Sequence, residues 1–257
     1  MNSDTKRAKW KLNRNIIDGL IFFIILGLLW EYAVKLFGIK SYLLPPLSDI
    51  FAAMWTARVQ LVEHSLVTLE EVIFGFGTAT IAGVAMAVVI YFVPLAKRTI
   101  YPLMIALQSI PKIGLAPVIV IWFGYGLSSK VIMAFLFAFF PIIIAVMGGL
   151  SGTPQHLEEH FRALKASAWD TFWYLRVPSV LPSFVDGCKV AMPLAVIGAI
   201  VGEFVGSNEG LGNLILMATG SSQTALTFGA LFAVTILSLS LFYIIELAGK
   251  LVWWRAH

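Results

Sequence analysis

The stretch TIYPLMIALQSIPKIGLAPVIVIWF, residues 99–123, decides how this chain folds. It is apolar and long enough to cross the roughly 30 Å of hydrocarbon in a bilayer, at about 1.5 Å of rise per helical residue. Pro102, Pro111 and Pro117 interrupt it, and proline breaks the backbone hydrogen bonding of a helix. Backbone groups freed inside a membrane must be satisfied by protein or by a wet cavity. We therefore expect a bent or broken span that faces the interior of a helical bundle.

The composition places the whole chain in a membrane. Of its 257 residues, 59% are hydrophobic and only 12% are charged, whereas soluble domains carry about 25% charged residues. Five further apolar segments accompany the first, at residues 16–37, 72–93, 131–150, 184–206 and 224–245. The sequence therefore predicts an all-α polytopic membrane protein with about six transmembrane helices, in a single domain of residues 16–252.

The lysines and arginines give the chain a direction in the bilayer. Twelve lie on one side of the alternating spans and four on the other, while Lys112 and Lys189 lie within spans. Cytoplasmic segments are enriched in Lys and Arg. The N-terminal segment of residues 1–15, the loop of residues 151–182 and the tail of residues 253–257 are therefore predicted to be cytoplasmic. No basic run is interleaved with aromatic residues, so the net charge of +4 does not indicate nucleic-acid binding.

Residues suited to catalysis or metal binding are few. The single cysteine, Cys188, and four scattered histidines form no clustered ligand set. The sequence contains no Gly-x4-Gly-Lys-Ser/Thr phosphate loop, and so no motif that would cradle a nucleotide. We expect no catalytic residue, no metal and no cofactor in this chain.

The loop of residues 151–182 is the longest polar segment and has helical periodicity. Apolar residues recur in it at steps of three and four, at Leu157, Phe161, Leu164, Ala168 and Phe172. This spacing predicts one short amphipathic helix. Two interpretations fit the pattern: a helix that lies on the membrane surface, or a docking helix whose apolar face fits a groove of a cytoplasmic partner.

The loop resembles the EAA loop of the permease subunits of ATP-binding-cassette importers. Glu159-His160-Phe161, Lys165, Leu175 and Val177-Pro178 follow the spacing of that loop. His160 and Phe161 depart from its Glu-Ala-Ala group, and Lys165 stands where the family usually has glycine. Further segments are similar to the nitrate, sulfonate, taurine and bicarbonate subgroup of these permeases: residues 44–48, 64–76, 110–124 and 202–212.

The resemblance implies a type I, MetI-like importer fold in a bacterial inner membrane, with both termini cytoplasmic. A second permease subunit, most simply another copy of this chain, would complete the pathway. Two cytoplasmic subunits would bind ATP and Mg, and an extracytoplasmic substrate-binding protein would deliver the cargo. The residues that the resemblance assigns to ATPase coupling are Glu158, Glu159, Phe161, Leu164, Lys165, Ala168, Leu175 and Pro178.

The candidate pathway residues are Gln108, Ser109, Lys112 and Glu203. A lysine in the middle of a span costs at least about 2.5 kcal/mol. We therefore expect Lys112 either to face a wet cavity, where it would attract an anion, or to have a structural role. The structural role would be an ion pair, for example with Glu203, or that of a lysine held near a helix break. Glu203 has two possible roles: it takes part in gating or helix positioning, or its carboxylate only reaches interfacial water.

The sequence thus predicts the permease subunit of an ATP-driven importer of a small anion, such as nitrate, a sulfonate, taurine or bicarbonate. One alternative is the same role for a neutral or aromatic compound of the pyrimidine type. A second is a gradient-driven carrier, which would need a relay of buried carboxylates or histidines that the central spans hardly offer. A third is a membrane anchor without transport, but a pure anchor would have no use for a span broken by prolines.

Overall fold

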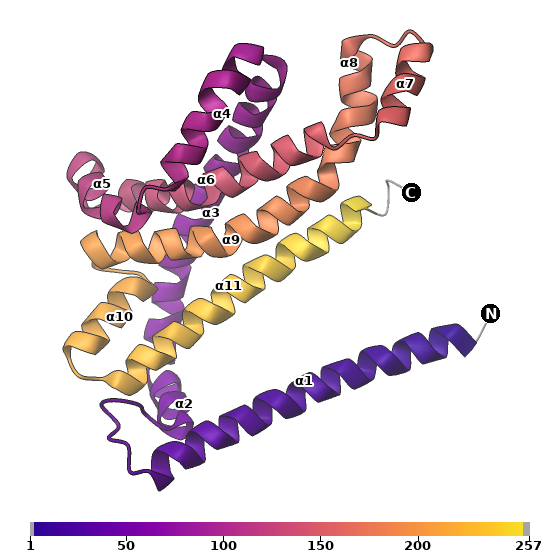
Figure 1. Cartoon of the computed structure of the whole chain (residues 1–257). Helices are drawn as coiled ribbons and strands as arrows, with labels where there is room; N and C mark the ends of the chain where they lie inside the picture. The colour runs from indigo at the N-terminus through magenta and orange to yellow at the C-terminus, as the bar shows by residue number, and fades with distance from the viewer. Residues whose placement is uncertain (1–2, 254–257) are drawn as a thin grey trace.

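The computed structural model describes residues 3–253, and the side chains of residues 17–251. The basic side chains of the N-terminal segment and the tail of residues 254–257 lie outside the described part. Every regular element of residues 3–253 is helical, which confirms the all-α prediction (Figure 1). In chain order these elements are α1 (Ser3–Leu36), α2 (Leu47–Thr56), α3 (Arg58–Phe92), α4 (Pro94–Gln108), the 3-10 turn η1 (Lys112–Leu115), α5 (Ala116–Phe123), α6 (Leu127–Ser151), α7 (Gln155–Ala163), α8 (Ala168–Thr171), the π turn η2 (Phe172–Arg176), α9 (Val177–Gly206), α10 (Leu211–Gly220) and α11 (Thr224–Trp253).

Five helical stretches of the described residues have the length and hydropathy of a membrane span, and a bent helix pair makes a sixth. The prediction of about six spans is thereby confirmed. The helices extend beyond several of the predicted limits, because α3 begins at Arg58 rather than Val72 and α9 begins at Val177. The five stretches are Ile17–Leu36, Arg58–Phe92, Leu127–Ser151, Ala168–Gly206 and Thr224–Leu251.

The predicted break in the third span is present. Pro94–Gln108 and Lys112–Phe123 meet at an angle of 90°. Pro111 precedes η1, and Pro117 lies in the first turn of α5, where a proline tolerates its missing N–H. Pro102 lies inside α4 without ending it. The bend therefore falls at Pro111, between two helices that are each too short to cross a bilayer.

The core of the bundle is α6, which packs against α3 on one side and α9 on the other. Small residues permit this close approach. A Cβ atom added to Gly198 of α9 would lie 2.6 Å from the backbone oxygen of Met133 in α6, so only glycine fits there. Fully buried side chains such as Met133, Ile142 and Val196 fill the space between the helices.

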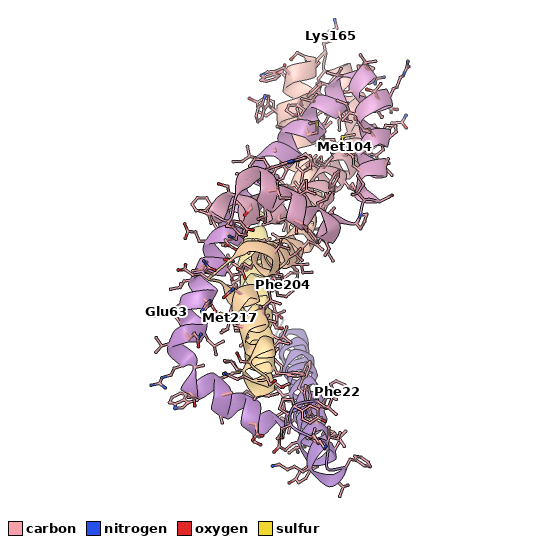
Figure 2. All side chains as sticks on the ribbon, turned by 90° about the vertical axis from the view of Figure 1, so that its left-hand side faces the viewer. Phe22, Glu63, Met104, Lys165, Phe204 and Met217 are labelled. Carbon is pink, nitrogen blue, oxygen red and sulfur yellow. The ribbon has the colours of Figure 1, made fainter. Side chains whose placement is uncertain are left out.

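Helix α1 lies apart from this bundle for most of its length (Figure 1). Its attachment is at its C-terminal end, where the Trp30 indole donates a hydrogen bond to the Pro45 carbonyl at 3.1 Å and stacks edge-on with Phe228 of α11. Phe22 and its neighbours on α1 are exposed, which suits a lipid-facing helix (Figure 2). Helices α7 and α8 project from the end of the molecule that lies opposite this attachment of α1 (Figure 1).

Candidate functional site

The loop between α6 and α9 forms two short arms, α7 and α8, that meet at a tight turn. The prediction of one continuous amphipathic helix over residues 157–172 is wrong, because α7 ends at Ala163 and α8 begins only at Ala168. The physical reason lies in the backbone of Lys165, whose φ of 54° is in the left-handed region. An α-helix cannot continue through such a residue.

The turn at Lys165 is a Schellman motif. The Lys165 N–H donates to the Arg162 carbonyl at 3.0 Å, and the Ala166 N–H donates to the Phe161 carbonyl at 3.0 Å. These two bonds satisfy carbonyls that the end of α7 would otherwise leave free. The left-handed position of this motif is usually occupied by glycine, since a Cβ atom there costs about 1–2 kcal/mol. The geometry thus explains why glycine is the usual residue at this position of the EAA loop.

A capping box starts the second arm. The Ser167 hydroxyl oxygen accepts from the Asp170 N–H at 3.1 Å, and the Asp170 carboxylate accepts from the Ser167 N–H at 3.2 Å. The arm then passes through η2 into α9 without a gap, and Pro178 lies in the first turn of α9. The second arm is therefore continuous with α9.

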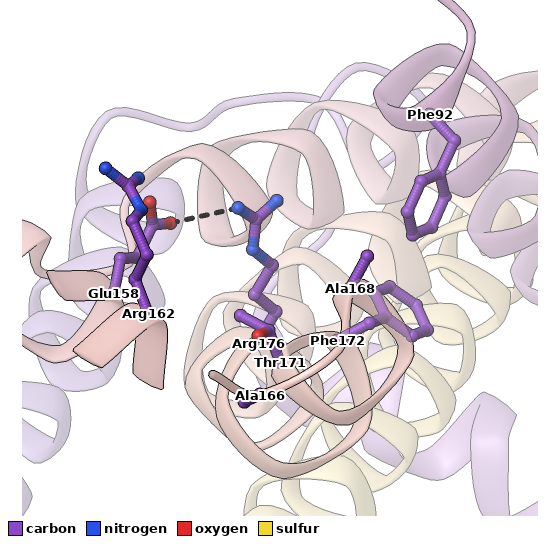
Figure 3. Close-up of a pocket in the computed structure, with 8 residues that line it drawn as sticks. All are labelled: Phe92, Glu158, Arg162, Ala166, Ala168, Thr171, Phe172 and Arg176. Carbon is purple, nitrogen blue, oxygen red and sulfur yellow. Dashed lines mark ion pairs between the residues drawn. The ribbon is translucent and has the colours of Figure 1, made fainter. Parts of the chain in front are cut away.

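A cleft of about 300 Å³ lies between the two arms and the end of α3 (Figure 3). Glu158 of α7 and Arg176 of η2 form an ion pair across it at 3.2 Å. The Arg176 guanidinium also lies 4.8 Å from the ring centroid of Tyr91 on α3. One arginine therefore joins the first arm, the second arm and α3. The remaining lining residues are Phe92, Arg162, Ala166, Ala168, Thr171 and Phe172.

An apolar cavity of about 570 Å³ adjoins this cleft and shares Phe92 and Phe172 with it. Its other walls come from α3, α6, α8 and α9, and include Val88, Leu150 and Trp173. The second arm therefore borders an apolar cavity at the end of the bundle, together with α3, α6 and α9.

The predicted coupling residues fall into two groups. Leu164 has 67% of its surface exposed, and Lys165 lies at the tip of the loop (Figure 2). Glu159 is exposed and accepts a hydrogen bond from Gln155 at 2.9 Å. Phe161 is half-buried, and Ala168 and Pro178 are exposed. The others face inward: Leu175 is buried, and Glu158 is held by Arg176.

The sequence analysis missed Arg176, Tyr91 and Phe92 as members of this site. Arg176 entered it only as one of twelve basic residues on the cytoplasmic side. Its partner Glu158 is on a different helix, so no spacing within one helix links the two. Only the folded-back turn at Lys165 brings them together.

The candidate pathway residues do not form one cluster. Gln108 and Ser109 are exposed at the end of α4, next to the bend. Lys112 is half-buried, and its ammonium lies 4.9 Å and 5.5 Å from the ring centroids of Phe140 and Phe137 on α6. Among the ion pairs of the described side chains, none joins Lys112 to Glu203. Lys112 is thus engaged with aromatic rings.

Glu203 lies deep in the protein, with 1% of its surface exposed. The Thr68 hydroxyl of α3 donates to its Oε1 at 2.6 Å, and the Gly212 N–H of α10 donates to its Oε2. Glu71, a second buried carboxyl group of α3, lies beside it. The sequence analysis missed Glu71 because it placed the second span from Val72 onward. In this conformation, Glu203 connects helices and does not line an open passage.

The loop forms an exposed surface at the end of the bundle. Exposed apolar side chains of the loop, among them Leu164, Trp169 and Tyr174, offer contact area, and the Glu158–Arg176 pair holds the arms together. No group of three or more metal-ligating side chains occurs within the described residues.

Comparisons with known proteins agree with this arrangement. Residues 79–253 match the family model of the binding-protein-dependent transport system inner membrane component. The chain is 37% identical over 203 residues to the formylaminopyrimidine transport permease protein ThiX of Halalkalibacterium halodurans, covering 79% of this chain and 81% of that protein. It is 33% identical to the riboflavin transport system permease protein RibX of Chloroflexus aurantiacus, covering 92% and 89%.

Similarity extends to a permease named for taurine and to a solved structure. The taurine transport system permease protein TauC of Escherichia coli is 20% identical, with 93% of this chain and 89% of that protein covered. A chain of the methionine ABC transporter MetNI aligns with a TM-score of 0.60 at 22% identity, over 79% of this chain and 97% of that chain. This likeness confirms the MetI-like fold.

Proposed function

We propose that this chain, which belongs to the family of binding-protein-dependent transport system inner membrane components and is an ABC importer permease, carries an uncharged aromatic heterocycle rather than a small anion. As such a permease it is a multi-pass inner membrane protein that performs no catalysis, and it works with ATPase and substrate-binding partners. The proposal concerns the class of cargo, the coupling surface and the arrangement of the complex.

The observation that carries the cargo proposal is the ranking of similarity among relatives with different named cargos. The permeases named for formylaminopyrimidine and riboflavin are 37% and 33% identical to this chain, whereas the taurine permease is 20% identical. Both of the first two compounds are nitrogen heterocycles with flat aromatic rings. The findings therefore favour the pyrimidine-type alternative over the anion prediction.

The surroundings of Lys112 support the same choice. Its ammonium lies over two phenyl rings, an arrangement in which ring quadrupoles partly satisfy the charge. A lysine held in this way is less available to attract an anion than one that faces water. We assign Lys112 to the bend between α4 and η1, where it fixes this segment against α6 through Phe137 and Phe140.

The loop of α7 and α8 is our proposed coupling surface. Leu164 and Lys165 at its tip would contact the ATPase subunit, together with the exposed Glu159. Movement of the tip would pass through the Arg176 junction to α3 and α9. We propose the domain arrangement of the sequence analysis with it: a single permease domain of residues 16–252, flanked by cytoplasmic segments of residues 1–15 and 253–257.

We propose that two copies of this chain form the pathway, with Gln108, Ser109 and Lys112 of each copy near it and both termini in the cytoplasm. The charge asymmetry of twelve basic residues against four supports this orientation. The exposed positions of Gln108 and Ser109 at the bend support their place at a surface that a second copy or the cargo would contact.

Uptake by the reconstituted complex tests the class of cargo. Proteoliposomes containing the permease, its ATPase subunits and its binding protein would be supplied with ATP and with labelled formylaminopyrimidine, riboflavin, taurine or nitrate in turn. We expect ATP-dependent uptake of a heterocycle and no uptake of taurine or nitrate. Uptake of taurine or nitrate alone would overturn the proposal.

A Lys112→Met variant refines this test, because methionine keeps a long side chain against Phe137 and Phe140 but removes the charge. We expect heterocycle uptake close to that of the wild type. A loss of uptake in Lys112→Met that Lys112→Arg restores would show instead that the pathway needs a cation at this position. Equal amounts of assembled complex are the control for both variants.

A further inference from the structure

A second group of polar residues lies buried at the end of the bundle away from the loop, and neither the coupling loop nor the cargo proposal uses it. It joins α3, α9 and the start of α10 through Thr68, Glu71, Glu203 and Gly212. Glu71 lies 21 residues before the end of α3 at Phe92, or about 30 Å along the helix. The group is therefore about one membrane thickness from the loop.

Both oxygens of the Glu203 carboxyl group accept hydrogen bonds. Its Oε1 accepts from the Thr68 hydroxyl at 2.6 Å, and its Oε2 accepts from the Gly212 N–H. Thr68 in turn accepts from the Leu211 N–H at 2.9 Å. The carboxyl group thus lies at the N-terminus of α10, where free N–H groups and the helix dipole favour a negative charge.

The two glycines around Leu211 make room for this carboxylate. Gly210 has a φ of 94°, which a residue with a side chain rarely adopts. Its carbonyl oxygen accepts a hydrogen bond from Nδ1 of His64 at 2.9 Å. A Cβ atom at Gly212 would lie 2.7 Å from Glu203 Oε2. The Gly210-Leu211-Gly212 turn is therefore shaped around the Glu203 carboxyl group.

Glu71 brings a second carboxyl group to the same place. It has 2% of its surface exposed, and its side chain is within hydrogen-bonding reach of Glu203. Its Oε2 is buried and accepts no hydrogen bond from any described residue. Two ionised carboxyl groups can only accept hydrogen bonds, so two of them in contact in a buried place repel each other. A proton between the two would turn this repulsion into a hydrogen bond.

The surrounding charges do not remove the need for that proton. Lys130 of α6 interacts with both carboxyl groups, but its ammonium already donates to the carbonyls of Tyr125 and Gly126. On α3, His64 faces Glu203 and the neighbouring Glu70 adds another negative charge near Glu71. Helix α10 carries no titratable side chain. One cation therefore faces two buried carboxyl groups.

We infer that Glu71 and Glu203 form a buried proton-binding site, in which Glu71 carries the proton and donates it in a hydrogen bond to the Glu203 carboxylate. The assignment to Glu71 follows from the contacts, because two donors and a helix N-terminus face Glu203, whereas Glu71 Oε2 receives none. The bound proton holds α3 against α9 and α10 at the end of the bundle opposite the loop.

Infrared spectroscopy of the full-length protein in lipid nanodiscs at neutral pH tests this site. Exposed Asp and Glu side chains are ionised at that pH, so a carboxylic acid C=O band reports a buried protonated group. We expect such a band in the wild type, its loss in Glu71→Gln and its persistence in Glu70→Gln. Glu70 is the matched control, because it is the exposed neighbour of Glu71 on the same helix.

Thermal unfolding of the same samples separates the roles of the two residues. Glutamine at position 71 still donates a hydrogen bond, so Glu71→Gln should unfold at the wild-type temperature, while Glu203→Gln loses the carboxylate and should unfold several degrees lower. The inference is overturned if the wild type shows no carboxylic acid band, if the band survives Glu71→Gln, or if both variants unfold equally early. The wild-type spectrum decides the matter even if a variant fails to fold.

Discussion

At the scale of single residues, the backbone of Lys165 makes a direct prediction about stability. Its left-handed φ of 54° is easy for glycine and costs other residues about 1 kcal/mol or more. We expect Lys165→Gly to raise the free energy of unfolding by about 1 kcal/mol, measured as a higher unfolding temperature. Lys165→Ala is the control, because it removes the charge and keeps the strain; equal effects of the two variants would contradict the backbone explanation.

The fit of Gly212 against Glu203 predicts the opposite effect. A methyl group there would lie 2.7 Å from Glu203 Oε2, at a place where α9 and α10 are already in contact. We expect Gly212→Ala to lower the free energy of unfolding by about 1–3 kcal/mol, the usual cost of overpacking. Gly220→Ala, at the other end of α10 with nothing within 4 Å, is the control. An unfolding temperature equal to the wild type in Gly212→Ala would contradict this contact.

The sequence predicted some residues of the sites and not others. The position of Lys165 stood out, since it replaces the glycine that the resemblance led us to expect, and the structure supplies the physical reason for that glycine. Glu71 and Arg176 did not stand out. Each interacts with a partner on another helix: Glu71 with Glu203, and Arg176 with Glu158. Spacing along one helix carries no information about such a contact.

At the scale of helices, the Glu158–Arg176 ion pair is expected to hold the two arms of the loop in one geometry. Both side chains are partly exposed, so the pair itself should contribute about 1 kcal/mol or less to stability. Its larger effect should be on coupling. We expect Glu158→Gln and Arg176→Gln each to reduce the ATP hydrolysis that cargo and binding protein stimulate in the reconstituted complex, and the double variant to lose little more than either one.

Asp186 and Lys189 provide the control for that experiment. They form an ion pair at 3.1 Å on α9, away from the turn, and one of them is largely exposed. Asp186→Asn should leave stimulated hydrolysis unchanged. If it reduced hydrolysis as much as Glu158→Gln does, the effect would belong to surface charge in general and not to the junction of the two arms.

The helices that the sequence predicted best are those with a strong local signal. The break at Pro111 was expected because proline acts on its own backbone. Helix α10 was missed because its ten residues are too few for a span, and they lie in the segment between the last two spans. The split between α7 and α8 was missed because apolar residues keep their helical spacing across the turn at Lys165.

At the scale of the whole molecule, the two polar groups lie at opposite ends of the same bundle. Helix α3 contributes Tyr91 to the loop cleft and Glu71 to the buried carboxyl pair, and α9 begins beside the first group and ends beside the second. Rigid helices of this length transmit displacement from end to end. In the proposed coupling, α3 and α9 would link ATP hydrolysis on one side to the passage of cargo across the membrane.

Native mass spectrometry of the purified complex tests the proposed coupling of this chain to its ATPase through the tip of the α7–α8 loop. We would compare the wild type with Leu164→Asp, which places a charge on the exposed tip, and with Gln223→Asp, which places the same charge at the α10–α11 turn at the opposite end. We expect Leu164→Asp to lose the ATPase subunits and Gln223→Asp to retain them. Retention of the ATPase at wild-type stoichiometry in Leu164→Asp would contradict the proposed coupling.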